Sequence, residues 1–301
     1  PIGVVAAITP WNFPLAMMTR KLGPALASGC TGIVKPAKQS PISAIAFCKL
    51  VEMAEIPRGV INLVIGNAGP ISDEIFENPI VRKISFTGST EIGKLLVTKS
   101  ASQLKRLSLE LGGHAPFIVF EDADLEAAAS GAVASKFRNT GQTCVCANRI
   151  YVQRSVLDKF SEIFVKKVQA LKVGNSLDPS VQVGPLVSSE GLEKVEEHVH
   201  DALAKGARVL CGGQRIGGEL SEGLFYEPTV LAGVNTDMLI TKEETFGPVA
   251  PIIPFDTEEE VIQYANNTEY GLAAYFYTQN ISRAVRVSEA LEFGIVGLND
   301  S

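Results

Sequence analysis

Short apolar runs alternate with amphipathic stretches along the first third of the chain. The runs have the length and the β-branched content of buried strands, and the stretches between them repeat apolar residues at helical spacing. Strands are predicted at Val4–Ile8, Gly32–Val34, Val60–Ile65, Lys83–Thr87 and Arg106–Leu109. Helices are predicted at Pro14–Ser28, Ser40–Glu55, Pro70–Phe76 and Thr90–Ser100. Strands that alternate with helices form parallel crossovers, so this part predicts a doubly wound parallel sheet, with ligands bound beyond the carboxyl ends of its strands.

The same alternation resumes after Gly112-Gly113 and predicts a second α/β domain. Its strands are expected at Phe117–Phe120, Ile150–Gln153, Ala207–Cys211, Val249–Phe255, Ala273–Tyr277 and Gly294–Leu298. Its helices are expected at 122–137, 156–168, 192–203, Glu258–Asn266 and Ser282–Leu291. We therefore expect two domains, residues 1–111 and 112–301.

Composition is that of a globular, soluble protein: of the 301 residues, 46% are hydrophobic and 20% are charged. The net charge of −6 offers no basic excess to neutralise phosphates, which disfavours a nucleic-acid partner. No apolar run approaches the length that spans a bilayer, so no membrane association is expected. Five cysteines are too few for a disulfide scaffold and favour a reducing compartment. Cys30, Cys48 and Cys211 lie in apolar segments and are expected in the core.

Two glycine-bearing turns have features of phosphate sites. The segment Gly88–Lys94 follows a strand and opens a helix as a P-loop does, but Leu95 stands where Ser or Thr would hold Mg²⁺. This opposes a phosphotransferase, although the helix N-terminus retains the capacity to hold a phosphate. The usual G-x-G-x-x-G fingerprint is absent. Lys35 at a strand end and Gly66–Gly69 after another strand are weak nucleotide signals, with a surface lysine and a plain turn as the alternatives.

Cys144 is the strongest candidate for catalysis. It lies in the polar, glycine-bearing stretch 137–147, between a predicted helix and a predicted strand, where a thiolate is approachable. A zinc site is disfavoured because no histidine has ligand spacing to Cys144 and Cys146. A buried structural cysteine is the plainer alternative.

Glu110 and Asn12 supply two further groups of an acyl-transfer site. Glu110 ends a strand close to two glycines and suits a general base for water. Asn12, in the rigid loop Pro10–Pro14, suits the stabilisation of an oxyanion. A surface glutamate and a turn asparagine are the alternatives.

Six segments together resemble the aldehyde dehydrogenase superfamily. They occur in family order as PWNFP at Pro10–Pro14, Lys35-Pro36, FTGS at Phe86–Ser89, ELGG at Glu110–Gly113, GQTC at Gly141–Cys144 and EETFGP at Glu243–Pro248. Within the superfamily, residues 136–146 and Thr19–Lys21 look most like succinate-semialdehyde dehydrogenase. The resemblance implies that 1–111 is a cofactor-binding domain and 112–301 a catalytic domain.

The resemblance implies an NAD(P)-dependent oxidation through a covalent intermediate. Cys144 would attack the aldehyde carbon, Asn12 would hold the oxyanion, and Glu110 would activate the water that releases the acid from the thioester. No metal is implied. The implied cofactor-binding residues are Thr9, Pro10, Trp11, Lys35, Lys38, Gly66, Gly69, Phe86, Gly88, Ser89, Glu244 and Phe246.

The implied substrate is a small semialdehyde, first of all succinate semialdehyde, which would place the enzyme in GABA degradation. Arg20 and Arg138 match positions that clamp the distal carboxylate, a group that a guanidinium fork suits well. A different semialdehyde or aldehyde is one alternative. An inactive, truncated aldehyde-dehydrogenase-like binding protein is another.

Lys38 and Cys146 carry two finer expectations. Many NAD-preferring relatives have an acidic residue at the position of Lys38, and a lysine there would attract a 2′-phosphate, so we predict NADP⁺ with NAD⁺ tolerated. A Cys144–Cys146 disulfide would be strained and easily reduced, which predicts a redox switch on the nucleophile.

The resemblance also implies more chain than these residues. An N-terminal part of the cofactor domain and a C-terminal part of the catalytic domain would lie outside 1–301. A homo-oligomer, dimer or tetramer, is implied for the full-length protein, in the cytoplasm or the mitochondrial matrix.

Overall fold

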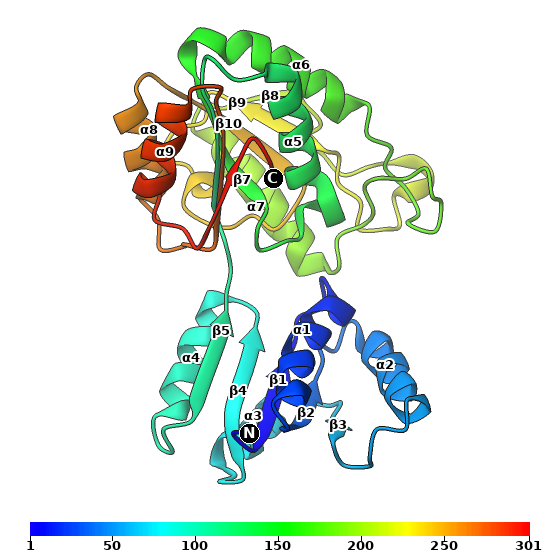
Figure 1. The fold of residues 1–301 in the computed structure, drawn as a ribbon. Helices are drawn as coiled ribbons and strands as arrows, with labels where there is room; N and C mark the ends of the chain where they lie inside the picture. Colours follow the sequence, from blue (N-terminus) through cyan, green and yellow to red (C-terminus); the bar gives the residue numbers. More distant parts are fainter. The chain divides into compact units, whose positions relative to one another are not determined.

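The computed structural model describes residues 1–301, which separate into two compact units, Pro1–Gly112 and Gly113–Ser301 (Figure 1). The predicted border between residues 111 and 112 lies one residue from this division. Both units combine a β-sheet with packed helices, and the predicted α/β fold class is confirmed.

The first unit is built on a parallel five-stranded sheet in the order β3-β2-β1-β4-β5. The strands are β1 Val4–Ile8, β2 Thr31–Lys35, β3 Ile61–Leu63, β4 Val81–Thr87 and β5 Arg106–Glu110. The chain proceeds outward from β1 through β2 to β3 and then returns to the other side of β1 for β4 and β5. The strand order therefore reverses between β1 and β4, which is where doubly wound sheets bind their ligands.

Helices cover both faces of this sheet. They are α1 Pro14–Ala27, α2 Pro41–Met53, α3 Ala68–Glu77 and α4 Thr90–Ser100. Apolar residues of α1 and α2 pack with Ala7 and Val34 on one face, whereas those of α3 and α4 pack with Ala6 and Ile84 on the other. Because side chains alternate along a strand, neighbouring residues such as Ala6 and Ala7 serve opposite cores.

The second unit contains a seven-stranded sheet in the order β12-β11-β6-β7-β10-β9-β8. Its strands are β6 Ala115–Val119, β7 Ala147–Gln153, β8 Arg208–Cys211, β9 Thr229–Ala232, β10 Val249–Phe255, β11 Ala273–Tyr277 and β12 Ile295–Leu298. All neighbours are parallel except the pair β8 and β9, which is antiparallel. The helices are α5 Leu125–Phe137, α6 Leu157–Gln169, α7 Ser189–Ala204, α8 Glu258–Asn266 and α9 Ile281–Ala290.

Two separate cores flank this second sheet. Helices α5 and α6 pack with Phe117 and Ile150 on one face. Helices α7, α8 and α9 pack with Ile118 and Tyr151 on the other. The central strands β6, β7, β10 and β11 are therefore buried on both sides, which explains why their sequences are largely continuous apolar runs rather than alternating ones.

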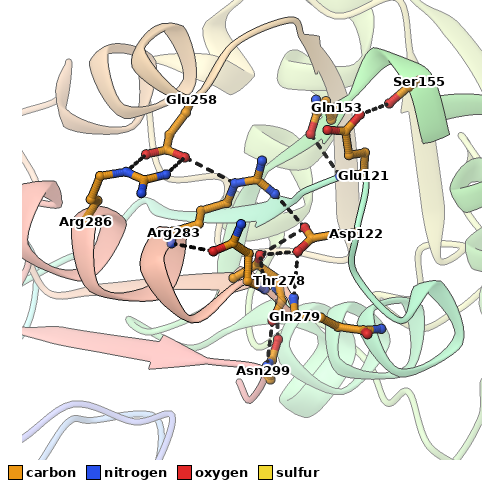
Figure 2. A network of polar contacts seen from close by, with 11 residues as sticks. Glu121, Asp122, Gln153, Ser155, Glu258, Thr278, Gln279, Arg283, Arg286 and Asn299 are labelled. Atoms are coloured by element: carbon orange, nitrogen blue, oxygen red, sulfur yellow. Dashed lines mark hydrogen bonds and ion pairs between the residues drawn. The ribbon is translucent and has the colours of Figure 1, made fainter.

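A polar network ties the last helices to the loop after β6. Arg283 of α9 donates to Asp122 at 2.6 Å and to Glu258 of α8 at 3.2 Å, and Figure 2 shows its guanidinium between the two carboxylates. Asp122 also accepts from the Thr278 hydroxyl and from the Gln279 N–H. These hydrogen bonds, together with the Arg283 charge, lower the pKa of Asp122 although partial burial acts to raise it.

Several sequence expectations need correction. Strand β9 was not predicted, and the strand expected at Val60–Ile65 is only Ile61–Leu63. Cys48 is only partly buried because α2 buries Ala44 alone, and Cys211 is only partly buried because β8 lies at a sheet edge. Cys30 is buried as expected. None of the helices combines the length and the apolar character needed to cross a bilayer.

Candidate active site

In the first unit, the predicted cofactor residues gather along one edge of the sheet. Thr9, Pro10 and Trp11 follow β1, Lys35 ends β2, and Ser89 follows β4. Since all five strands are parallel, their carboxyl ends share this edge. Thr9 and Ser89 flank the point between β1 and β4 where the strand order reverses, which is the expected place for a dinucleotide.

The turn between β4 and α4 has room only for glycine at position 88. A side-chain carbon on Gly88 would lie 2.4 Å from the ring of Phe86, so the ring can tuck beneath the turn only if that carbon is absent. Ser89 then caps α4, its hydroxyl accepting from the Ile92 N–H at 3.4 Å. A capped helix N-terminus that opens at the carboxyl edge of a sheet suits a phosphate group.

The two lysines of the predicted cofactor set differ in environment. Lys35 is half-buried, donates to the Pro36 carbonyl at 3.2 Å, and has its pKa lowered by burial. Lys38 is exposed. Gly66 lies in the loop after β3, whereas Gly69 lies in the first turn of α3 rather than in that loop. The two lysines and the α4 N-terminus offer positive charge and free N–H groups, which are the groups that bind phosphates in proteins.

The predicted base Glu110 is held by a chain of polar contacts within the first unit. Arg20 of α1 places Nη1 at 3.1 Å from each of the two Glu110 carboxylate oxygens. The Thr87 hydroxyl donates to Glu110 Oε2 at 3.3 Å, and Lys21 Nζ donates to that hydroxyl at 2.6 Å. Burial lowers the pKa of Lys21, with the Glu110 charge acting in the opposite direction. Asn12 lies on the loop after β1, with Oδ1 accepting from the Phe13 N–H at 3.1 Å.

In the second unit, Cys144 lies on a tightly constrained loop between α5 and β7. Asn139 and Thr140 have φ values of 51° and 60°, which are unusual for residues with side chains, and Gly141 follows at 75°. The Thr140 hydroxyl donates to the Gly184 carbonyl at 3.0 Å. Tyr275 donates to the Val145 carbonyl at 2.8 Å, and burial raises the pKa of Tyr275 to about 12, so it remains a donor. Cys144 is partly exposed at this position.

Three glycines allow backbone segments distant in sequence to meet around Cys144. A side-chain carbon on Gly113 would lie 1.9 Å from the Cys144 carbonyl oxygen. One on Gly141 would lie 2.2 Å from the Gly247 carbonyl oxygen, and one on Gly247 would lie 2.2 Å from Val195 of α7. The cysteine loop and the loop before β10 are therefore interlocked at the amino edge of the sheet.

Glu244 belongs to the same assembly. Its Oε1 accepts from the Gly113 N–H at 3.1 Å, so one glycine contacts both Glu244 and the Cys144 backbone. Burial raises the pKa of Glu244 to about 7. His198 of α7 shares a hydrogen bond of 3.0 Å with the Thr245 hydroxyl, and burial lowers its pKa to about 4, so it is neutral near pH 7. Phe246 follows with a φ of 53°.

Cys146 and Arg138 lie on either side of the predicted nucleophile Cys144 in the sequence and differ sharply in exposure. Cys146 is fully buried, its sulfur facing the Lys136 carbonyl at 3.5 Å, and burial raises its pKa. An oxidant would therefore reach Cys144 before Cys146. Arg138 follows the last residue of α5, and its side chain is exposed to solvent and to charged solutes. No group of three or more His, Cys, Asp or Glu residues in the structure is placed to hold a metal ion.

The sequence matches the aldehyde dehydrogenase family over residues 1–301. The chain belongs to this family. It is 57% identical to the Escherichia coli succinate-semialdehyde dehydrogenase [NADP(+)] GabD, over 99% of this chain and 61% of that protein. It is 56% identical to a glutarate-semialdehyde dehydrogenase of Pseudomonas putida, over 99% of this chain and 61% of that protein. The chain thus spans about three fifths of the length of these relatives. The crystal structure of an E. coli NADP-dependent enzyme superposes with a TM-score of 0.97 at 57% identity, covering 100% of this chain and 62% of that one.

Sequence reasoning assigned no role to several residues that lie beside the predicted site residues in the structure. Gly113 was quoted only as part of a motif, yet it contacts both Cys144 and Glu244. The histidines, His198 among them, entered only through the absence of zinc-ligand spacing, and Thr87 was not singled out. For His198, one signal was available in the sequence. The residue shares the face of α7 that carries Val195 and Val199, so its spacing predicts a buried histidine in a helix that is otherwise rich in charged residues.

Proposed function

We propose that this chain carries the catalytic and cofactor residues of an NADP-dependent dehydrogenase for a short semialdehyde, with succinate semialdehyde first. The observation that carries the substrate class is the guanidinium of Arg20, which already contacts both oxygens of a carboxylate, that of Glu110. Arg138 adds a second exposed cation beside the nucleophile's loop. Two guanidinium groups suit the distal carboxylate of a semialdehyde better than they suit an uncharged aldehyde.

In this proposal Cys144 acts as nucleophile through its thiolate. The sulfur adds to the aldehyde carbon, and the Asn12 amide stabilises the resulting oxyanion of the thiohemiacetal. When bound, an oxidised nicotinamide would supply the oxidising power as the acceptor of the hydride that leaves the thiohemiacetal carbon, and a thioester on Cys144 would result. Glu110 then takes a proton from a water molecule while the oxygen of that water attacks the thioester carbon. The carbon–sulfur bond breaks, and the thiolate of Cys144 leaves with the bonding electrons.

The cofactor would be held by residues of both units. Lys35 and Lys38 would meet the adenosine ribose and its 2′-phosphate, Ser89 and the α4 N-terminus the pyrophosphate, and Glu244 the nicotinamide ribose. The Glu244 carboxylate already accepts the Gly113 N–H, which orients it before any ligand arrives. We extend the proposal to a homo-oligomeric enzyme of the cytoplasm or the mitochondrial matrix, where reducing conditions keep Cys144 a thiol.

The test is a steady-state assay at 340 nm on the natural-length protein, with succinate semialdehyde, glutarate semialdehyde and butanal, each with NADP⁺ and NAD⁺. We expect kcat/KM for a semialdehyde to exceed that for butanal by at least about tenfold, equivalent to about 1.4 kcal/mol. Cys144→Ser should abolish turnover while leaving the thermal unfolding temperature close to that of the parent. A kcat/KM for butanal equal to that for the semialdehydes would contradict the proposed substrate class. A tenfold preference for NAD⁺ over NADP⁺ would contradict the proposed cofactor.

A further inference from the structure

The contact between Arg20 and Glu110 joins two residues that the proposed function uses for different purposes. Arg20 lies in the second turn of α1, and Glu110 is the last residue of β5. Nη1 of Arg20 donates to both oxygens of the Glu110 carboxylate, each at 3.1 Å. The Arg20 side chain is 57% exposed and that of Glu110 is 22% exposed, so the pair is accessible to a small solute.

Only one of the three guanidinium nitrogens of Arg20 contacts Glu110. Nε and Nη2 of Arg20 donate to no atom within the first unit, so two edges of the guanidinium can still receive another carboxylate. Glu110 has a contact besides Arg20, because its Oε2 also accepts from the Thr87 hydroxyl, which in turn accepts from Lys21 Nζ. A ligand that attracts Arg20 would therefore leave Glu110 in place on Thr87.

We propose that Arg20 is a specificity-determining residue that acts through Glu110: the carboxylate of the substrate exchanges with that of Glu110 on the guanidinium and thereby releases the base for hydrolysis of the thioester. This inference rests on the proposed roles of Arg20 and Glu110. While Glu110 faces Arg20, its oxygens are directed at a cation rather than at a water. An anionic aldehyde removes that constraint, whereas a neutral aldehyde leaves it in force.

The strength of the ion pair suits such an exchange. An exposed pair contributes little, and a competing carboxylate brought in by a covalently bound substrate has a high effective concentration. The discrimination falls on thioester hydrolysis, in which water adds to the acyl carbon, Glu110 receives the proton and the Cys144 thiolate leaves. A neutral aldehyde should accordingly form the thioester readily and hydrolyse it slowly.

The first experiment compares Arg20→Gln with the parent protein of natural length, using butanal and NADP⁺ in a stopped-flow instrument. The parent should show a burst of NADPH equal to the active sites, followed by slow turnover. In Arg20→Gln the steady-state kcat for butanal should rise about two- to fivefold, the range that an exposed ion pair supports, and the burst should shrink. Arg58→Gln, which removes an exposed arginine elsewhere in the unit, is the matched control.

The second experiment supplies the carboxylate separately. Acetate added to the parent should accelerate propanal turnover in a saturable manner, whereas chloride at the same ionic strength should not. The acceleration should be absent in Arg20→Gln.

The outcomes separate this inference from the proposed function. A lower kcat/KM for succinate semialdehyde in Arg20→Gln, with butanal turnover and the burst unchanged, would keep the substrate clamp and overturn the exchange. Faster butanal turnover with unchanged kcat/KM for succinate semialdehyde would show that Arg20 restrains Glu110 without binding the substrate carboxylate, and this result would overturn the exchange. A parent that shows no burst with butanal, or no response to acetate, overturns the exchange. The thermal unfolding temperature of each variant, within about 2 °C of the parent, verifies that folding is retained.

Discussion

Replacing Gly113 with alanine should displace the backbone of Cys144 while leaving the second unit folded. The added carbon would lie 1.9 Å from the Cys144 carbonyl oxygen, whereas ordinary contact begins at about 3.4 Å. The two segments must therefore separate by about 1.5 Å. Neither partner can yield by rotating a side chain, because both sides of the contact are backbone.

The expected magnitudes differ for stability and for catalysis. Overpacking of this kind costs about 1–3 kcal/mol, which lowers the unfolding temperature of a unit of this size by several degrees. A displacement of about 1 Å at a reacting group costs about 100-fold in rate. Gly113→Ala should thus lose about two orders of magnitude in kcat/KM. The backbone N–H at position 113 should also no longer donate to Glu244 in the geometry of the parent.

Two assays check this prediction, and one of them is independent of turnover. The first is kcat/KM at 340 nm, and the second is the rate at which iodoacetamide alkylates Cys144, followed by mass spectrometry. Gly191→Ala in α7 is the control, since its added carbon would meet nothing closer than 3.8 Å. If Gly113→Ala keeps at least a third of the parent kcat/KM and the parent alkylation rate, the close contact does not position the nucleophile.

Three further predictions concern cofactor, redox chemistry and acid stability. Lys38→Glu should lower the ratio of kcat/KM for NADP⁺ over NAD⁺ at least about tenfold, because a carboxylate repels a 2′-phosphate; an unchanged ratio would place Lys38 away from that phosphate. Peroxide should inactivate the parent and dithiothreitol should restore it, since the partly exposed Cys144 oxidises before the buried Cys146, which then closes the disulfide; equal recovery in Cys146→Ala would refute the switch. The lowered pKa of Asp122 contributes stability that is present above its unfolded value of 3.8 and is lost as the pH falls through the folded pKa. Asp122→Asn should therefore cost about 1–2 kcal/mol at pH 7 by urea denaturation and much less near pH 3, while Asp158→Asn should change neither.

The helices and strands were predictable where local signals agree. Helix α4 has the predicted bounds Thr90–Ser100 because Ser89 caps it, and α8 has the predicted bounds Glu258–Asn266 because Thr257 caps it. Strand β7 begins three residues before its predicted start, at Ala147, because Asn148 and Arg149 look like loop residues in sequence. They are buried in the strand since Arg149 donates to three backbone carbonyls and Asn148 accepts from Lys136.

The candidate residues could be named from the sequence as chemical groups, but the contacts between them could not. Cys144 and Glu110 follow from their local sequence and from the resemblance. The pairing of Glu110 with Arg20 joins residues 90 positions apart, and the hydrogen bond between Gly113 and Glu244 joins residues 131 positions apart. Such contacts depend on the strand order of each sheet, which local patterns do not specify.

The interlocked glycines have a consequence for how this kind of enzyme can diversify. Gly141 and Gly247 admit no side chain without moving a neighbouring backbone or Val195, so a lineage that alters this loop risks losing the nucleophile's position. Arg20 and Arg138 lie outside the interlocked backbone and are exposed. If the proposed roles hold, mutations at these two positions can change the aldehyde that is bound while the backbone around Cys144 stays unchanged.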